Sequence, residues 1–215
     1  MTKKRQNKSG TAAKRTRGRP AVEIIRTAPE VKLDFGSGQV PREGFEGVDL
    51  HAPNAKHRVD LMKLPLPWVD ASVDAIHCSH FLEHLPARDV EERDLLSNDG
   101  DHLGKDFLFA FMDECHRILK PGGVMSVAVP ALQSVRAFQD PTHRRFFPQV
   151  TFLYFSKEWR ELQRLDHYRT TCNFGVEVVP IVPVPETARA PEVQGQRITE
   201  LWNVVIDWQA KLVKL

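Results

Sequence analysis

The chain has 215 residues, a length that suits one domain with at most a small appendage. It has no run of about 18 apolar residues, and no apolar stretch follows its basic first residues, so the sequence predicts neither a membrane span nor a signal peptide. The three cysteines are far apart in sequence, which argues for a reducing compartment and against a disulfide framework or a cysteine-built zinc site. We therefore expect a cytoplasmic protein.

The net charge of +2 conceals an uneven distribution. Residues 1–20 carry eight basic side chains and no acidic one, and removing these eight from the 30 basic residues leaves 22 against 28 acidic ones. The body is therefore mildly anionic, whereas a folded domain that wraps duplex DNA usually presents a basic face. The charge distribution argues against a DNA-binding body.

The first 21 residues have almost nothing to bury, and we expect a disordered basic arm over 1–21. Its centre, Arg17-Gly18-Arg19-Pro20, resembles the core of an AT-hook, a short arm that lies in the minor groove of A·T-rich DNA. The resemblance implies weak DNA or polyanion contact, and the alternative is a basic tail without a specific partner. The cations concerned are Lys14, Arg15, Arg17 and Arg19.

From residue 31 on, the pattern predicts strands that alternate with helices. A late strand or hairpin, placed at a sheet edge by its prolines, is predicted over 174–184. Short apolar or β-branched runs predict the other strands over 31–35, 45–50, 57–61, 72–79 and 122–130.

Three helices are predicted from apolar residues at helical spacing. One begins at Ser79, a plausible N-cap, and continues toward Leu96; a second covers 105–120 and ends at Lys-Pro-Gly-Gly; an amphipathic third closes the chain over 196–215. Alternating strands and helices predict an α/β, Rossmann-like, mostly parallel sheet flanked by helices. We expect this domain over 22–185, followed by a linker and the closing helix over 186–215.

Chemistry-bearing residues follow four successive predicted strands. In "LDFGSG" the first strand ends at Asp34 and runs into Gly36-Ser37-Gly38, where glycines let the backbone approach a ligand. A carboxylate at the end of the second strand, Asp49, can bind both hydroxyls of a ribose. The carboxyl ends of parallel strands share one edge, so we expect one site there; the remaining strand ends are Asp60-Leu61 and Cys78-Ser79-His80.

With these motifs in place, residues 30–156 resemble the class I S-adenosylmethionine-dependent methyltransferases. "LDFGSG" is similar to their first motif, "LPLPWVDASVDAIHCSHFLEHL" (64–85) to the strand that leads into a Leu-Glu-His helix, and "RILKPGGVMSVAVP" (117–130) to their Leu-Lys-Pro-Gly-Gly turn. "GSGQVPREGFEGVDL" and "DPTHRRFF" (140–147) resemble a small bacterial and phage subgroup with a shortened first helix. Fifteen positions separate Asp34 from Asp49, against about 20 in a standard dinucleotide-binding unit, which supports this subgroup over a hydride-transfer enzyme.

The resemblance implies S-adenosylmethionine as cofactor. It assigns the methionine end of the cofactor to Asp34, Gly36, Ser37 and Gly38, the ribose to Asp49 with Leu50 beside it, the adenine to Asp60 and Leu61, and the sulfonium region to Ser79 and His80. Asp60 has the alternative role of a turn cap and Ser79 that of a helix cap.

The histidines have two possible uses. His80 and His84 have the spacing of metal ligands on a helix, but no third ligand with matching context follows in sequence, and we predict no metal. His143, with Asp140, is predicted in a loop at the active edge and could take a proton from the acceptor. The alternative is that Asp140 and His143 brace the loop by hydrogen bonds.

The segment after the fourth strand reads "HCSHF", which matches neither the Asn/Asp-Pro-Pro-aromatic motif nor the Pro-Cys motif of DNA-base methyltransferases. The sequence therefore predicts transfer of a methyl group to oxygen or nitrogen of an unidentified acceptor. The rival interpretation is a degenerate methyltransferase fold that binds without catalysis and is tethered to DNA by the arm.

Overall fold

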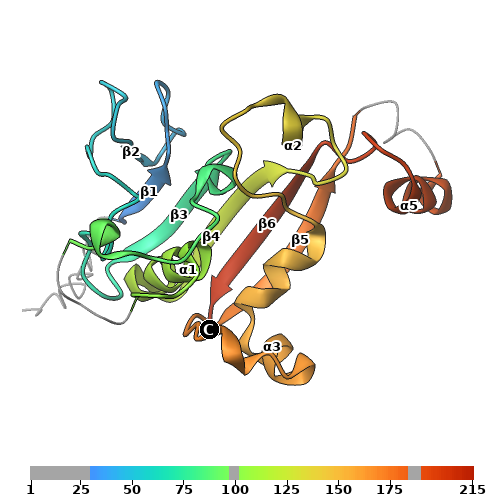
Figure 1. Ribbon diagram of the computed structural model, residues 1–215. Coiled ribbons are helices and arrows are strands. Elements are labelled where there is room, and N and C mark those ends of the chain that lie inside the picture. Colours follow the sequence, from blue (N-terminus) through green and yellow to red (C-terminus); the bar gives the residue numbers. More distant parts are fainter. Residues whose placement is uncertain (1–29, 97–101, 184–189) are drawn as a thin grey trace, which may run out of the picture.

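The computed structural model describes residues 30–96, 102–183 and 190–215 (Figure 1). The predicted arm over 1–21 lies outside these ranges. The described residues form a six-stranded sheet in the order β2-β1-β3-β4-β6-β5. The strands are β1 (Lys32–Phe35), β2 (Glu46–Val48), β3 (Val73–Ser79), β4 (Leu119–Pro130), β5 (Phe174–Ile181) and β6 (Asp207–Lys214).

The strands β2, β1, β3 and β4 are parallel neighbours, while β6 runs antiparallel between β4 and β5. This arrangement confirms the predicted α/β fold with a mostly parallel main sheet. It also confirms the edge position of the late strand, because β5 is the last strand of the order. The carboxyl ends of β1, β2, β3 and β4 therefore meet at one edge.

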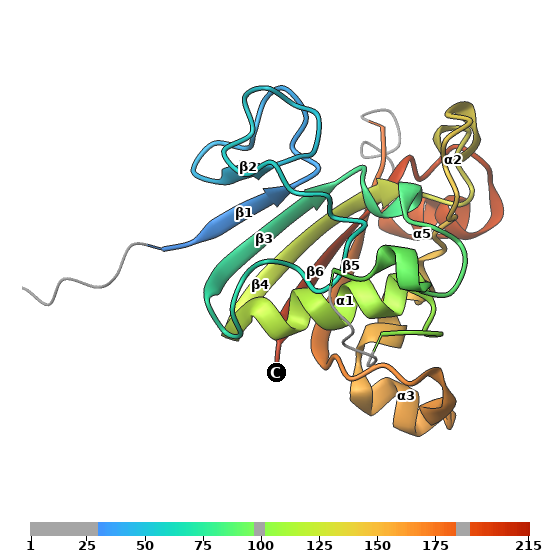
Figure 2. The ribbon, with the colours of Figure 1, turned by 60° about the vertical axis from the view of Figure 1, so that its left-hand side comes forward.

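The helix α1 (Phe107–Ile118) covers the apolar face of the sheet (Figure 2). The Asp106 side chain caps it by accepting a hydrogen bond from the Leu108 amide at 2.9 Å. Its buried side chains join Met125 and Val127 of β4 in one core. Among the described residues, no helix has the length and apolarity that a membrane crossing requires.

Short helical segments complete the structure. A second layer of aromatic side chains, including Phe152 and Phe155, belongs to the same core as α1. The segments are η1 (Leu82–His84), η2 (Glu92–Asp94), α2 (Arg136–Gln139), η3 (Gln149–Phe155), α3 (Lys157–Gln163), η4 (Asp166–Tyr168) and α5 (Pro191–Glu200).

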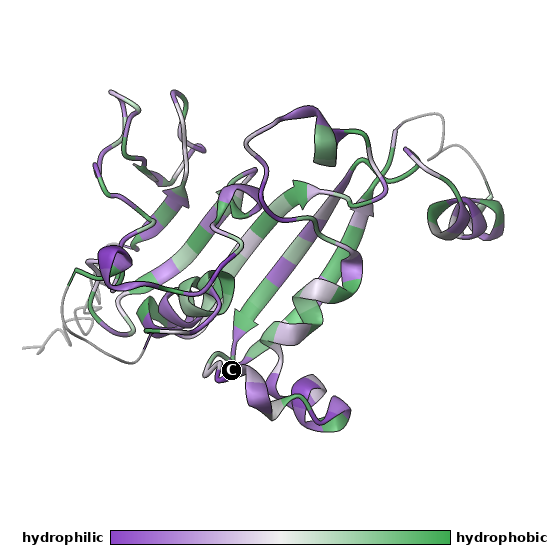
Figure 3. Ribbon diagram, in the orientation of Figure 1, coloured by the Kyte–Doolittle hydropathy of each residue, from purple (hydrophilic) through white to green (hydrophobic). Residues whose placement is uncertain are grey.

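The predicted closing helix over 196–215 is wrong. Its first residues belong to α5, but 207–214 form β6, which pairs with β4 and β5 inside the sheet. The apolar residues of this stretch fit a helical period and a two-residue strand period. The strand period prevails, because Trp208 and Leu212 are buried while Lys211 is exposed. Figure 3 shows hydrophilic and more hydrophobic positions alternating along much of β6. The predicted domain boundary at 185 is therefore wrong too, since β6 is an integral strand.

The predicted helix from Ser79 toward Leu96 is also absent from the described residues. Ser79 is the last residue of β3, and η1 and η2 are two separate single turns. His80 has a positive φ of 53°, which turns the chain before a helix can begin. Ser79 is therefore no helix cap, since Phe81 occupies the N-cap position of η1.

Two smaller predictions need correction. The stretch 57–61 forms a single bridge between His57 and Val48 instead of a strand. The helix over 105–120 ends at Ile118, because Leu119 already pairs with β3, and Lys-Pro-Gly-Gly forms an irregularity within β4. Gly122 has a φ of +75° there, a conformation that glycine adopts without strain.

Candidate active site at the carboxyl edge of the parallel strands

The glycine loop connects β1 to β2 in a tight turn. Gly36 has a φ of +67°, and its amide donates to the Val48 carbonyl at 2.9 Å. Gly38 has a φ of +57°, and its amide donates to Asp49 Oδ2 at 3.1 Å. The loop thus joins the ends of β1 and β2, as predicted for a site at this edge.

Asp49 is the most strongly held carboxylate of the edge. Its Oδ1 accepts hydrogen bonds from the amides of His51 at 2.8 Å and Ala52 at 2.9 Å, in addition to the bond from Gly38 to Oδ2. Burial raises the pKa of Asp49, but the three amide bonds outweigh it and keep the pKa below its ordinary value. The side chain is therefore a fixed, ionised acceptor beside the glycine loop, and Leu50 next to it is exposed.

Asp34 has a bracing role that the sequence did not predict. It is buried in β1, level with Gly47 of β2 and His77 of β3, and its Oδ2 accepts from the Arg42 amide at 2.7 Å. This bond folds residues 38–44 over the strand end. Beside it, the Ser37 hydroxyl is buried against Gly47 and has no hydrogen-bond partner among the described residues.

Asp60 and Leu61 lie farther along the same edge. Asp60 Oδ1 accepts from the Met62 amide at 2.9 Å, and the Asp60 carbonyl accepts from the Lys63 amide at 3.0 Å. These bonds correspond to the turn-cap alternative for Asp60. Leu61 is buried in the core at 4% exposure, so its side chain packs inward.

His80 connects the end of β3 to two acidic side chains. Its Nδ1 lies 3.2 Å from Glu83 Oε1, and its Nε2 lies 3.8 Å from Asp207 Oδ2. The hydrogen bond with Glu83 raises the pKa of His80. Asp207, at the start of β6, thus lies beside the candidate site, and sequence reasoning missed it because this stretch was assigned to a helix.

The Asp-Pro-Thr-His loop packs against η1. Asp140 Oδ1 accepts from the amide of Thr142 at 2.8 Å and from its hydroxyl at 2.7 Å. His143 Nδ1 donates to the Ala137 carbonyl at 2.9 Å, and the rings of His143 and His84 are 4.9 Å apart between centroids. The predicted pair therefore braces the loop, and it lies beside the residues that follow β3.

The steric role of Gly36 gives a first prediction. A Cβ at this position would lie 2.8 Å from Phe81 Cδ2, whereas a Cβ at Gly38 would meet nothing within 4 Å. We expect Gly36→Ala to lower the free energy of unfolding by about 2–4 kcal/mol, and Gly38→Ala by about 1–2 kcal/mol from backbone strain alone. Urea denaturation of both variants measures the difference, and equal losses would show that Phe81 does not constrain the loop.

Comparisons with solved structures identify the fold. A methyltransferase dependent on S-adenosylmethionine from Archaeoglobus fulgidus superposes with a TM-score of 0.54 at 17% identity, over 86% of each chain. A second such enzyme, from Mesorhizobium loti, gives a TM-score of 0.47 at 17% identity, over 87% of this chain and 94% of that one. The chain has the class I methyltransferase fold. No protein-family model and no curated protein sequence matches it.

An exposed aromatic cluster flanks the site in this methyltransferase fold. The rings of Phe138 and Phe146 stack at 4.8 Å between centroids, and Trp202 lies 6.1 Å from Phe138. All three side chains are at least 43% exposed. Large exposed aromatic side chains that gather beside a site form a contact surface. Nothing in the sequence indicates this cluster, since Trp202 is distant in the chain from Phe138 and Phe146 and was placed on the closing helix.

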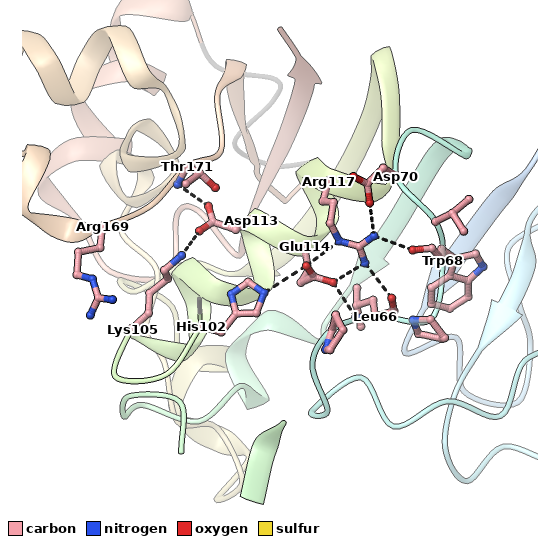
Figure 4. A pocket seen from close by; sticks show the side chains of 13 residues that line it. Leu66, Trp68, Asp70, His102, Lys105, Asp113, Glu114, Arg117, Arg169 and Thr171 are labelled. Carbon is pink, nitrogen blue, oxygen red and sulfur yellow. Dashed lines mark hydrogen bonds and ion pairs between the residues drawn. The ribbon is translucent and has the colours of Figure 1, made fainter. Parts of the chain in front are cut away.

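A large hollow among the described residues lies elsewhere. A cavity of about 1060 Å³ is formed by α1 and the segment before β3 (Figure 4). Its charged side chains bind one another: Lys105 contacts Asp113 at 2.6 Å, and Arg117 contacts Glu114 at 2.6 Å. Open α/β sheets bind ligands at the carboxyl ends of their parallel strands, and none of these strand ends lines this cavity. We interpret it as a structural charge network.

Proposed function

We propose that the chain is a methyltransferase that uses S-adenosylmethionine and transfers its methyl group to oxygen or nitrogen of an acceptor. The observation that carries the proposal is Asp49, a carboxylate fixed by three amides at the end of β2 and opposite the Gly36–Gly38 turn. A fixed acceptor at this place in an open α/β sheet suits the two hydroxyls of a ribose.

The other residues of the edge fit the remaining parts of this cofactor. The glycine turn and the partnerless Ser37 hydroxyl would receive its methionine end near Asp34. Leu50, Asp60 and the backbone of Leu61 would border the adenine. The group itself supplies an electrophilic methyl on a sulfonium, which the neighbouring Ser79 and His80 would face.

The acceptor side is formed by η1, the Asp-Pro-Thr-His loop and the aromatic cluster of Phe138, Phe146 and Trp202. Methyl transfer to a good nucleophile requires mainly positioning, which these rigid neighbours provide. His143 carries a ring lone pair on Nε2, because its Nδ1 donates to a carbonyl. A proton-accepting role for His143, with Asp140 holding the loop, is part of this proposal.

Methyl transfer itself is tested with the full chain and isotope-labelled S-adenosylmethionine. Metabolite and glycan fractions serve as acceptors, and Asp49→Ala serves as the inactive control. Labelled product from the wild type alone supports the proposal. Label transfer that persists unchanged in the Asp49 variant would reject this site, and binding without transfer to any fraction would favour the rival binding module.

We further propose that the basic arm tethers the domain to nucleic acid or another polyanion. Arg17 and Arg19 flank a glycine, a pattern that suits a narrow A·T-rich groove. Deletion of 1–21 is expected to abolish DNA retardation at low salt and to leave cofactor affinity unchanged. Gel shifts with A·T and G·C duplexes measure the retardation by the full chain and by the deletion variant. Retardation that survives the deletion would place DNA binding on the body, and equal retardation by both duplexes would leave a generic tail.

A further inference from the structure

Three donor side chains from two separate segments converge next to the proposed acceptor space. Glu83 and His84 belong to η1, and His143 belongs to the loop after α2. One ligand atom from each lies within 4.8 Å of the others. The loop is fixed in this position, because the amides of Arg144 and Arg145 both donate to the Glu83 carbonyl, at 2.7 and 3.0 Å.

The hydrogen bonds of both histidines leave the same nitrogen available for a metal. His143 Nδ1 donates to the Ala137 carbonyl at 2.9 Å, so the lone pair of the neutral ring is on Nε2. His84 Nδ1 lies 3.1 Å from the Thr142 hydroxyl, which itself donates to Asp140 Oδ1 at 2.7 Å. A histidine that binds a metal usually donates its other ring N–H to a carbonyl, a carboxylate or a group linked to one, and both histidines have such a partner.

The carboxylate provides an independent observation. Glu83 is 1% exposed, and its Oε2 has no hydrogen-bond partner among the described residues, while its Oε1 contacts His80 at 3.2 Å. A buried carboxylate oxygen without a partner is costly, and a cation supplies the missing partner. The same carboxylate contributes one of the three donor atoms that converge with the two histidines.

We propose that Glu83, His84 and His143 bind a divalent transition-metal ion of the zinc type. Two imidazoles and one carboxylate suit Zn²⁺, Co²⁺ or Fe²⁺, and three protein ligands leave a coordination position open. Ligands of a tetrahedral zinc ion lie roughly 3.4 Å apart at bond lengths of about 2.0–2.1 Å, so donors within 4.8 Å of one another must approach by up to about 1.4 Å. Side-chain rotation supplies such a movement.

The open position gives the metal a role toward the acceptor. It would hold an acceptor oxygen, a hydroxyl or a carboxylate, in the space between the loop and the end of β3. This role rests on the proposed methyltransferase function, whereas metal binding does not. The sequence alone does not reveal these three ligands, because Glu83 is the direct neighbour of His84 and His143 follows His84 only after 59 positions.

Cobalt titration tests the site directly. The full chain, without a histidine tag and freed of metal by a chelator, is titrated with Co²⁺ and followed by its visible absorption. We expect one equivalent to bind, and Zn²⁺ to displace it. The ligand variants His84→Ala, His143→Ala and Glu83→Gln should each weaken binding more than about 100-fold, and Thr142→Val about 10- to 100-fold through lost support of His84.

The control variant is His167→Ala, because His167 is an exposed histidine of η4 outside the site. Its Co²⁺ affinity should equal that of the wild type. Circular dichroism of each metal-free variant verifies folding, so that lost binding is not confused with unfolding. Absence of one-to-one binding by the wild type at about 100 µM Co²⁺, or undiminished binding in folded His143→Ala, would overturn the proposal. Cobalt binding without S-adenosylhomocysteine binding would support the metal site and reject the proposed function.

Discussion

Replacing Glu114 with glutamine is expected to lower the free energy of unfolding by about 3 kcal/mol at pH 7. Burial raises the pKa of Glu114, but hydrogen bonds from Arg117, His102 and the Leu66 amide outweigh it and lower the pKa from 4.5 to about 2. That difference corresponds to about 3 kcal/mol, since each tenfold change in proton affinity is worth about 1.4 kcal/mol. The variant also leaves Arg117 without its main ion-pair partner.

The pH dependence of this effect has a defined sign. The pKa is lower in the folded state, so the stabilisation is fully present above pH 4.5 and is lost as the pH falls from 4.5 through about 2. Urea denaturation of wild type and Glu114→Gln at several pH values should therefore show curves that converge in acid. Glu177→Gln, at an exposed glutamate of β5, is the control. A constant difference between pH 7 and pH 3 would contradict the ionised network.

Replacing Asp49 with alanine is expected to weaken the affinity for S-adenosylhomocysteine by at least about 100-fold. Hydrogen bonds to a charged group contribute about 1.5–3 kcal/mol each, and the ribose would make two of them. The variant also frees the amides of Gly38, His51 and Ala52, so its melting temperature must be recorded alongside affinity. Glu43→Ala, an exposed carboxylate of the same loop, should keep wild-type affinity. Equal affinity in both variants would remove Asp49 from the site.

The site at the sheet edge could be predicted because its signals are local. Strands that end in Asp34, Asp49 and Ser79 were recognisable from short apolar runs stopped by turn residues, and parallel pairing brings such ends together. The glycines at 36 and 38 have the positive φ that their place after a strand indicates. For the same reason the chain's α/β class followed from the alternation of elements alone.

The errors lie where tertiary contacts decide between two patterns. Trp208 and Leu212 fit a helix as well as a strand, and the gap between β4 and β5 selects the strand. His80 and His84 have helical spacing, but the positive φ of His80 limits the helical segment after it to the single turn η1. Position in space also explains why two groups of residues were missed, since neither the proposed metal ligands nor the Phe138 cluster is contiguous in sequence.

The hydrogen bonds of Asp140 and His143 bear on both the proposed proton acceptor and the proposed metal ligand. Sequence reasoning left two alternatives open, a proton acceptor or a loop brace, and the hydrogen bonds of the loop show the brace. The bracing bonds also fix which ring nitrogen of His143 is free. The same geometry therefore serves the proposed proton acceptor and the proposed metal ligand, and cobalt titration separates the two.

Calorimetric titration of the full chain with S-adenosylhomocysteine tests the central claim most directly, because it requires no knowledge of the acceptor. We expect one molecule to bind per chain with a dissociation constant on the order of micromolar, and pre-bound ligand to raise the melting temperature. No binding heat and no thermal shift at several hundred micromolar ligand, in protein shown to be folded, would contradict a cofactor site at the edge formed by Asp34, Gly36, Gly38 and Asp49.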